Sequence, residues 1–281
     1  MPASSSAAAL RDQIFAANRA TGRIALSVAA KHGVSRRARV HEAGSLRVRF
    51  PNRHNEGALD AVIVNTAGGM TGGDRFELDF ELDAGARLSV TTVAAEKIYR
   101  SLGPDTNVGV KLMIADGAAL AWLPQETILF DQVRLRRTID VELAGDAQLL
   151  LAEAIVFGRA AMGETLSFGH LFDRWHVRLD GTLIFAETTR IDGGIAEQLA
   201  ARATAAGGAA IAGILKIPGD EAAVAAVNAM QQNFSGEVGA SAWNGLALAR
   251  LVARDGAALR HDLAAIVSTW SNAPLPRLWL N

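Results

Sequence analysis

A motif that recurs about every thirty residues limits the folds open to this chain more than any other sequence feature. It consists of a turn with Gly or Asp, a small residue, one variable position, a leucine, and an extended apolar segment that carries an acid. The leucines are spaced by 32, 29 and 34 residues, and they are Leu88, Leu120, Leu149 and, in a looser copy, Leu183. A period of this length is typical of chains that wind into stacked coils.

A segment in which polar and apolar residues alternate precedes each turn, and this pattern predicts a strand. The predicted strands are residues 76–82, 108–114, 134–143 and 174–179. Each unit then holds at least two strands, so we expect a mainly β chain built as a β-helix or solenoid-like stack. A sandwich of repeated hairpins is the alternative, but turns in sandwiches usually come more often than about every thirty residues.

The composition changes after Gly194, where alanine becomes frequent and helical spacing appears. Apolar residues at helical spacing follow Asp220 and, over residues 257–270, follow Asp255. Two strand-like segments alternate with these predicted helices, at residues 210–217 and 246–252. The sequence therefore predicts a small C-terminal α/β part that contains two helices.

We expect one domain over residues 22–281, because no Pro-rich or Ser-rich linker interrupts it. Within it, residues 22–194 are expected to form the β stack and residues 195–281 the appended α/β part. Residues 1–21 are rich in Ala and Ser and are expected to be a mobile N-terminal segment.

Composition excludes several classes of function. The 28 Lys and Arg residues nearly balance the 29 Asp and Glu residues, so charge gives no argument for a nucleic-acid or membrane partner. The chain has no cysteine, which excludes disulfides, thiolate metal sites and cysteine nucleophiles. Because it also shows no signal-peptide pattern and no apolar run of about 18 residues, we expect a cytoplasmic protein.

Residues 65–74, which we call the glycine loop, read N-T-A-G-G-M-T-G-G-D and end on Asp74. Glycine-rich loops often bind phosphate, but such a site needs a Lys followed by Ser or Thr and a helix behind the glycines. Here a strand-like segment, residues 75–82, follows instead. We expect the glycines to form a tight corner between two strands, where the backbone packs closely.

The acid in each copy of the motif is the first candidate for chemistry. These acids are Glu96, Glu126, Glu153 and Glu187. If equivalent points of stacked coils coincide, they form a row with Asp74 near one end, and a row of acids can bind or pass a cation. The alternative is that each acid is exposed or paired with a base, and the nearby bases are Lys97, Arg100, Arg159 and Arg190.

Other arrangements of polar residues are less informative. Arg159 and Glu164 lie in a glycine-containing interruption of a strand, and such a couple is more often an ion pair than a catalytic pair. The six histidines show no H-x-H or H-E-x-x-H spacing, so we expect no stable metal centre. The chain also lacks a G-x-S-x-G motif, and its single tyrosine offers little for stacking sugars or bases.

Six blocks of sequence, in order, resemble the urease accessory protein family UreD, which is called UreH in some organisms. The blocks are N-T-A-G-G-M-T-G-G-D (65–74), A-A-E-K-I-Y-R-S (94–101), W-L-P-Q-E-T-I-L-F-D (122–131), F-G-R-A-A-M-G-E (157–164), D-R-W-H-V-R-L-D-G (173–181) and P-R-L-W (276–279). The resemblance covers about residues 22–281, and blocks in series are more specific than any one alone. It implies a β-helix-like stack with a small helical part, in agreement with the repeat.

The resemblance also implies that the protein is not an enzyme. Members of the family bind apo-urease and the accessory proteins UreF and UreG, of which UreG is a GTPase that brings nickel. The UreD-type protein is implied to bridge these partners and to offer an interior channel for Ni²⁺ in transit, with no stably bound cofactor. Carboxylates suit such a channel, because oxygen ligands release a divalent cation more readily than thiolates or several histidines do.

The expected channel residues lie within or beside the matched blocks. They are Asp74, Glu96, Glu126, Glu153 and Glu164. The expected supporting residues are Arg159, which would hold a carboxylate in place, Lys97 and Asp131.

Two other functions remain open from the sequence. One is a β-helical glycan hydrolase that uses paired carboxylates, and the other is a structural scaffold without a channel. Replacing Glu126 or Asp74 with Ala distinguishes the channel hypothesis from the scaffold hypothesis. A channel predicts normal assembly with UreF and urease but reduced urease activation. Cleavage of glycans by the purified protein alone would favour the hydrolase.

Overall fold

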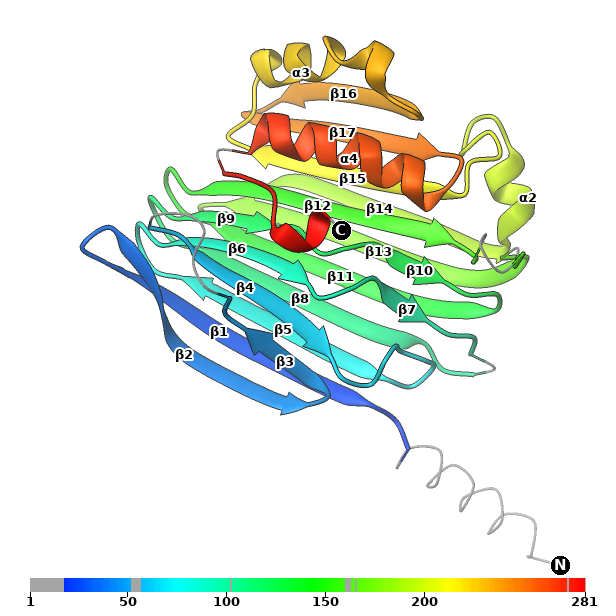
Figure 1. The fold of residues 1–281 in the computed structure, drawn as a ribbon, viewed down its shortest axis with the longest axis horizontal. Coiled ribbons are helices and arrows are strands. Elements are labelled where there is room, and N and C mark those ends of the chain that lie inside the picture. Colours follow the sequence, from blue (N-terminus) through cyan, green and yellow to red (C-terminus); the bar gives the residue numbers. More distant parts are fainter. Residues whose placement is uncertain are drawn as a thin grey trace, which may run out of the picture.

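The computed structural model describes residues 18–51, 57–101, 103–159, 163–164, 166–271 and 273–280. Most of the N-terminal segment that the sequence predicts to be mobile, residues 1–21, lies outside these ranges. The first strand begins at Thr21. Strands dominate the described chain, so the mainly β prediction is confirmed (Figure 1).

Seven strands form the first sheet, in the order β14-β13-β11-β8-β5-β1-β2. Their bounds are β1 Thr21–Lys31, β2 Val34–Gly44, β5 Arg75–Leu82, β8 Thr106–Ile114, β11 Val133–Leu143, β13 Phe168–Leu179 and β14 Thr182–Gly194. Strands β1, β5, β8, β11 and β13 run parallel, and β2 and β14 are added antiparallel at the two edges.

The second sheet has the order β16-β17-β15-β12-β9-β6-β4-β3. Its strands are β3 Leu46–Arg49, β4 Leu59–Asn65, β6 Arg87–Thr92, β9 Ala119–Trp122, β12 Gln148–Phe157, β15 Ala210–Ile217, β16 Glu237–Trp243 and β17 Leu246–Ala253. Strands β4, β6, β9 and β12 are parallel to one another. Two short strands, β7 (Glu96–Ile98) and β10 (Thr127–Leu129), pair in parallel beside the end of β12.

The chain winds back and forth between the two sheets, and each winding contains one copy of the recurrent motif. β5 leads to β6, β8 to β9, and β11 to β12, each through a tight turn. Leu88 pairs in register with Leu120, and Leu120 pairs with Leu149. The predicted stack of coils is therefore confirmed.

The turns explain the small residues of the motif. Gly85 and Gly117 have φ angles of 70° and 68°, a region that glycine occupies at little cost. The alanines that follow them, Ala86 and Ala118, are completely buried. The N–H of Gly85 donates to the carbonyl of Asp116 at 3.1 Å, so neighbouring turns stack directly on one another.

The fourth copy of the motif does not continue the stack, contrary to the prediction. Asp180 and Gly181 both have positive φ angles, of 49° and 76°, which is the geometry of a two-residue hairpin turn. Strand β14 therefore folds back antiparallel on β13 within the first sheet. As a result Leu183 is 44% exposed, whereas Leu88 and Leu120 are each 2% exposed.

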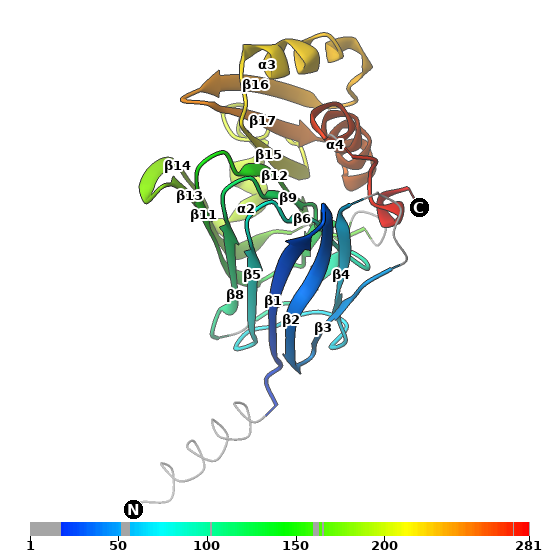
Figure 2. The same ribbon diagram turned by 90° about the vertical axis from the view of Figure 1, so that its left-hand side faces the viewer.

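The C-terminal part extends the second sheet. Strand β15 pairs antiparallel with β12, and β17 and β16 follow outwards. The two predicted helices are confirmed as α3 (Glu221–Asn228) and α4 (Gly256–Trp270), which lie with these strands at one end of the stack (Figure 2). The prediction missed strand β16 and a third, short helix, α2 (Ile195–Ala200).

Two apolar cores hold these layers together. The larger lies between the two sheets and includes Phe76, Phe80 and Trp122. The smaller lies between the C-terminal strands and their helices and includes Trp270 and Trp279, the latter in the 3₁₀ helix η3 (Arg277–Trp279). A second 3₁₀ helix, η2 (Gln231–Asn233), follows α3. Within the described ranges, no helix is both long enough and apolar enough to cross a membrane.

Leu88, Leu120 and Leu149, which stack on one another and which we call the leucine ladder, predict that two leucine-to-alanine substitutions differ strongly in their effect on stability. Leu120→Ala removes a buried side chain between two coils and should lower the free energy of unfolding by about 2–5 kcal/mol. Leu183→Ala lies in the copy of the motif that forms a hairpin instead of a coil, and it should change the free energy of unfolding by less than about 0.5 kcal/mol. Urea unfolding of both variants measures this difference, and equal losses would contradict the assignment of the ladder.

Candidate functional site

The glycine loop forms a corner between β4 and β5. A side chain at Gly72 would overlap the Ser101 hydroxyl, and one at Gly69 would overlap the Tyr99 ring. The N–H of Tyr99 donates to the Met70 carbonyl at 2.7 Å, so the loop packs against the segment that follows β7. The expectation that these glycines serve turning and close packing is confirmed.

Asp74 holds this corner from the inside. The residue is 3% exposed. Its Oδ1 accepts a hydrogen bond from the N–H of Ala20, and its Oδ2 accepts one from the N–H of Thr71, both at 2.8 Å. Because backbone donors occupy both oxygens, the carboxylate anchors the loop to the start of β1.

The acids of the motif do not form the expected row. Glu96 pairs in register with Thr127, and Thr127 pairs with Ile155, so Glu96 has a threonine and not an acid beside it. Glu187 lies in the first sheet, where Arg250 Nη2 donates to its Oε2 at 2.6 Å. The row prediction was wrong because the three acids of the second sheet follow their leucines by 8, 6 and 4 residues and so occupy different positions on their coils.

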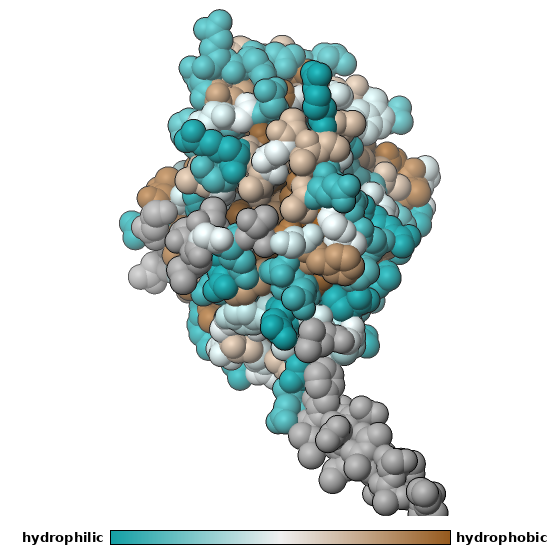
Figure 3. Space-filling view, turned by 90° about the vertical axis from the view of Figure 1, so that its right-hand side faces the viewer, coloured by the Kyte–Doolittle hydropathy of each residue, from teal (hydrophilic) through white to brown (hydrophobic). Residues whose placement is uncertain are grey.

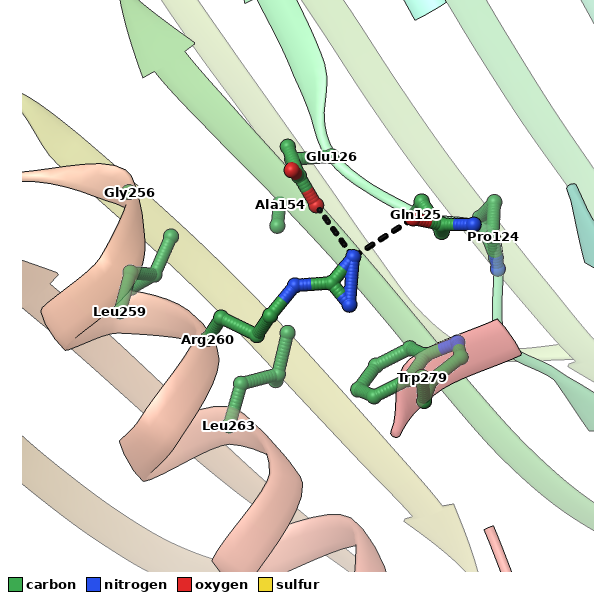
Figure 4. A pocket seen from close by; sticks show the side chains of 9 residues that line it. All are labelled: Pro124, Gln125, Glu126, Ala154, Gly256, Leu259, Arg260, Leu263 and Trp279. Carbon is green, nitrogen blue, oxygen red and sulfur yellow. Dashed lines mark hydrogen bonds and ion pairs between the residues drawn. The ribbon is translucent and has the colours of Figure 1, made fainter. Parts of the chain in front are cut away.

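Glu126 faces helix α4 (Figure 4). Arg260 of α4 donates to Gln125 Oε1 at 2.6 Å and to Glu126 Oε2 at 3.3 Å. The same guanidinium lies 6.0 Å from the ring centre of Trp279. Glu126 is therefore paired with a base 134 residues away and helps to attach the C-terminal part to the coils.

Glu164 and Arg159 form the ion pair that the sequence favoured. Arg159 Nε lies 2.6 Å from Glu164 Oε2, and its guanidinium stacks over the Phe130 ring at 4.2 Å. Phe130 in turn contacts Tyr99 edge to face, with ring centres 4.9 Å apart. This group therefore lies beside the glycine loop. Figure 3 shows the molecule from the side on which β7 and β10 lie in Figure 1, and apolar and polar surface alternate there.

Asp131 has a structural role at the same end. Its Oδ1 accepts hydrogen bonds from the N–H groups of Ser167 and Phe168, at 2.7 and 3.0 Å. Burial alone would raise the pKa of Asp131, but these two donors, together with hydrogen bonds from Gln132, outweigh it and lower the pKa. Lys97, the other expected supporting residue, is exposed.

Three buried charged side chains meet between the sheets, and we call Arg137, Glu153 and Asp173 the charged cluster. Each of them is 5% exposed. Arg137 donates from Nε to Asp173 Oδ1 at 2.9 Å and from Nη2 to Oδ2 at 2.6 Å, and its Nη1 donates to Glu153 Oε2. Trp122 Nε1 completes the cluster by donating to Glu153 Oε1 at 2.9 Å.

Strand alternation explains why two of these charges point inward. Every second residue of β11 is buried, and Arg137 takes one of those positions. Asp173 takes an inward position on β13, and the register of the two strands places it directly beside Arg137. Of the three residues, only Glu153 was predicted as a site residue. A charged residue in the apolar phase of an alternating strand was the sequence signal that could have found the other two.

Two cavities meet at the charged cluster. The larger, of about 360 Å³, lies between β13 and β14 of the first sheet and β15 and β17 of the second. It reaches the surface at Arg190 and Arg250, both of which are exposed. The smaller, of about 70 Å³, lies between the sheets and has Glu96 in its wall. Arg137 and Glu153 line both cavities, so the charged cluster forms the boundary between them.

Burial controls the protonation of these groups. It raises the pKa of Glu153, an effect that Arg137 opposes and Asp173 reinforces. Burial alone would lower the pKa of Arg137, but Asp173 and Glu153 raise it, so the guanidinium stays charged. Burial also raises the pKa of Glu96, against the hydrogen bond that Asn65 Nδ2 donates to its Oε2 at 3.1 Å.

The carboxylates between the sheets are the groups here that could contact a cation. In the part of the chain that the structure describes, no group of three or more His, Asp or Glu side chains is placed to hold a metal ion. The interior instead offers a pair of carboxylates at the charged cluster, both bonded to Arg137, and a separate carboxylate at Glu96. Oxygen ligands of this kind bind divalent cations reversibly.

The raised pKa of Glu96 makes one contribution to stability dependent on pH. Since the folded protein holds this proton more tightly than the unfolded chain, the wild type loses stability as the pH rises from the unfolded to the folded pKa. Glu96→Gln should therefore be more stable than the wild type at about pH 8, and the difference should vanish below about pH 4. Thermal unfolding across this range measures it.

Asn65→Ala serves as the companion variant in that experiment. It removes the hydrogen bond that lowers the pKa of Glu96, so its loss of stability with rising pH should be steeper than that of the wild type. If Glu96→Gln and the wild type differed in stability by the same amount at all pH values, the raised pKa of Glu96 would be contradicted.

Comparison with known proteins identifies the family. The family model described as UreD urease accessory protein matches residues 20–280. A protein of Rhodopseudomonas palustris named urease accessory protein UreD is 54% identical over 269 residues, which cover 96% of each chain. Its namesake in Bradyrhizobium diazoefficiens is 52% identical over 268 residues, covering 95% of this chain and 96% of the relative. Both names describe an accessory protein and not a catalyst, and at this similarity the chain belongs to the UreD family of urease accessory proteins.

Proposed function

We propose that the protein is a cytoplasmic urease maturation factor that binds apo-urease, bridges it to UreF and UreG, and passes Ni²⁺ between its two sheets. The name of its relatives connects it with urease, and the sequence blocks described above imply the other partners. Ni²⁺ is the cargo in this proposal, and no cofactor is bound stably.

One observation supports the proposed passage for Ni²⁺. Two cavities lie between the sheets, they share Arg137 and Glu153, and the larger one reaches the surface. A cation that entered the larger cavity would pass Glu187, which is paired with Arg250, before it met the Glu153 and Asp173 carboxylates. The Glu96 carboxylate lies further on, in the smaller cavity. Each supplies a negative charge where the surrounding side chains are mostly apolar, which offsets part of the cost of removing the cation from water.

The proposal changes the residues that the sequence assigned to the channel. Glu153 and Glu96 remain, because both line a cavity between the sheets. Asp74 holds the glycine loop, and Glu126 and Glu164 are paired with Arg260 and Arg159 outside the passage as we place it.

A glycan hydrolase fits this interior poorly. The closest candidate pair of carboxylates, Glu153 and Asp173, is buried, and both acids are held by Arg137. A hydrolase of this type needs one carboxylate free to protonate the leaving oxygen and a second within reach of the sugar. The scaffold without a passage is the alternative that requires an experiment.

Glu153→Gln tests the passage. It keeps the shape of the side chain and removes the negative charge, so the variant should still copurify with apo-urease while the rate of activation at limiting Ni²⁺ falls by roughly tenfold. The measurement is urease activity against time after Ni²⁺ and the accessory proteins are added to apo-urease.

Glu142→Gln is the matched control, because Glu142 lies on β11, the strand that carries Arg137, and its side chain is 52% exposed. It should leave activation unchanged. Normal activation by Glu153→Gln would favour the scaffold. A loss of activation in Glu126→Gln, with none in Glu153→Gln, would instead move the passage to the contact with α4.

A further inference from the structure

Arg137 occupies the boundary between the two cavities. Its side chain lines both of them and is 6% exposed. Three of its hydrogen bonds end on the carboxylates of the charged cluster, and a fourth reaches the hydroxyl of Thr127 at 3.4 Å. The guanidinium therefore lies between the two acids. A cation crossing from one cavity to the other would have to take the same position.

The charges of the cluster do not balance. With both acids ionised, two negative charges face one positive charge, and the indole N–H groups of Trp122 and Trp175 are the further donors, at 2.9 and 3.4 Å. Buried carboxylates of this kind need a cation, a proton or strong hydrogen bonds. Arg137 supplies this positive charge from the chain itself, so a cation is always available to the two acids.

We propose that Arg137 is a displaceable plug that closes the passage between the two cavities. When its guanidinium bridges Glu153 and Asp173 the passage is closed, and a divalent cation crosses only while the guanidinium has moved aside into the larger cavity. On returning, it competes with the cation for the same carboxylates at the high effective concentration of a tethered group. The acids can then attract the cation without retaining it.

This inference rests on the proposed passage and adds its regulation. The competing interpretation is that the cluster is only structural. A buried ion pair is weak support for that view, because such a group can often be replaced by apolar residues without loss of stability. Accessibility of the smaller cavity distinguishes the two.

A single introduced thiol can report on that accessibility, because the chain contains no cysteine. Val110→Cys places the thiol in the wall of the smaller cavity, at a position that is 3% exposed and of similar size. The probe is a small cationic methanethiosulfonate, which forms a mixed disulfide and releases methanesulfinate. The full chain, purified together with apo-urease, is labelled without nickel, and the rate is followed by mass spectrometry.

Removing the plug should increase the labelling rate of Val110→Cys by about tenfold or more. Arg137→Ala alone leaves two uncompensated acids, so a second variant combines Arg137→Ala with Glu153→Gln and Asp173→Asn. Both should show the increase. Arg136→Ala is the matched control, because Arg136 immediately precedes Arg137 on the same strand, and its side chain is 51% exposed and stacks on Phe172 outside the cavities. It should leave the rate unchanged.

Equal labelling with and without Arg137 would overturn the plug. An increase in Arg137→Ala that is absent from the neutral combination would also overturn it, since repulsion between the two acids would then be the cause. The labelling requires neither nickel nor urease activity, so its result can be read separately from the activation assay. Reduced activation in Glu153→Gln together with equal labelling would leave the passage standing and remove only the plug.

Discussion

The parallel register of the coils is the constraint on which the rest of this structure depends. It places each residue of one coil directly beside an equivalent residue of the next, as with Leu88, Leu120 and Leu149. The apolar side chains at these positions therefore stack on one another from coil to coil. The same rule makes an inward charge expensive unless a neighbouring coil provides its partner, and the β11–β13 register provides Asp173 for Arg137.

The charged cluster interrupts the apolar interior of the stack. Between the sheets the apolar core is otherwise extensive, and the two cavities described above meet at Arg137 and Glu153. Close packing normally leaves few voids larger than a water molecule inside a protein. The coincidence of buried charge and empty space at one point is the physical basis for assigning a passage there, and it connects the packing of the stack with the proposed transfer of a cation.

Many recognisable parts of the sequence maintain the ends of the coils. Asp74 fastens the glycine loop to Ala20, Asp131 fastens the turn at Ser167, and Trp279 donates its indole N–H to the Leu123 carbonyl at 3.0 Å. These contacts join segments far apart in the chain. Asp74, Asp131 and Trp279 all lie in the blocks that carry the family resemblance, so membership of such a block does not by itself mark a residue of the passage.

The sequence by itself determined the type of fold. Periodicity is a local property, so the thirty-residue motif, the alternation within strands such as residues 75–82 and the start of α4 after Asp255 could all be predicted from neighbouring residues. The family resemblance could be found in the same way, because its blocks keep their order along the chain.

Only the tertiary structure decided which charges meet. Arg137 is bonded to an acid 16 residues away and to another 36 residues away, and the partner of Glu126 lies 134 residues along the chain. Such pairings depend on strand register, on the hairpin at Asp180 and on unequal coil lengths. In a strand, a shift of one residue is enough to move a side chain between inside and outside. The sequence could therefore supply the acids, but only the packed coils could select Glu153 and Glu96 for the interior and direct the others elsewhere.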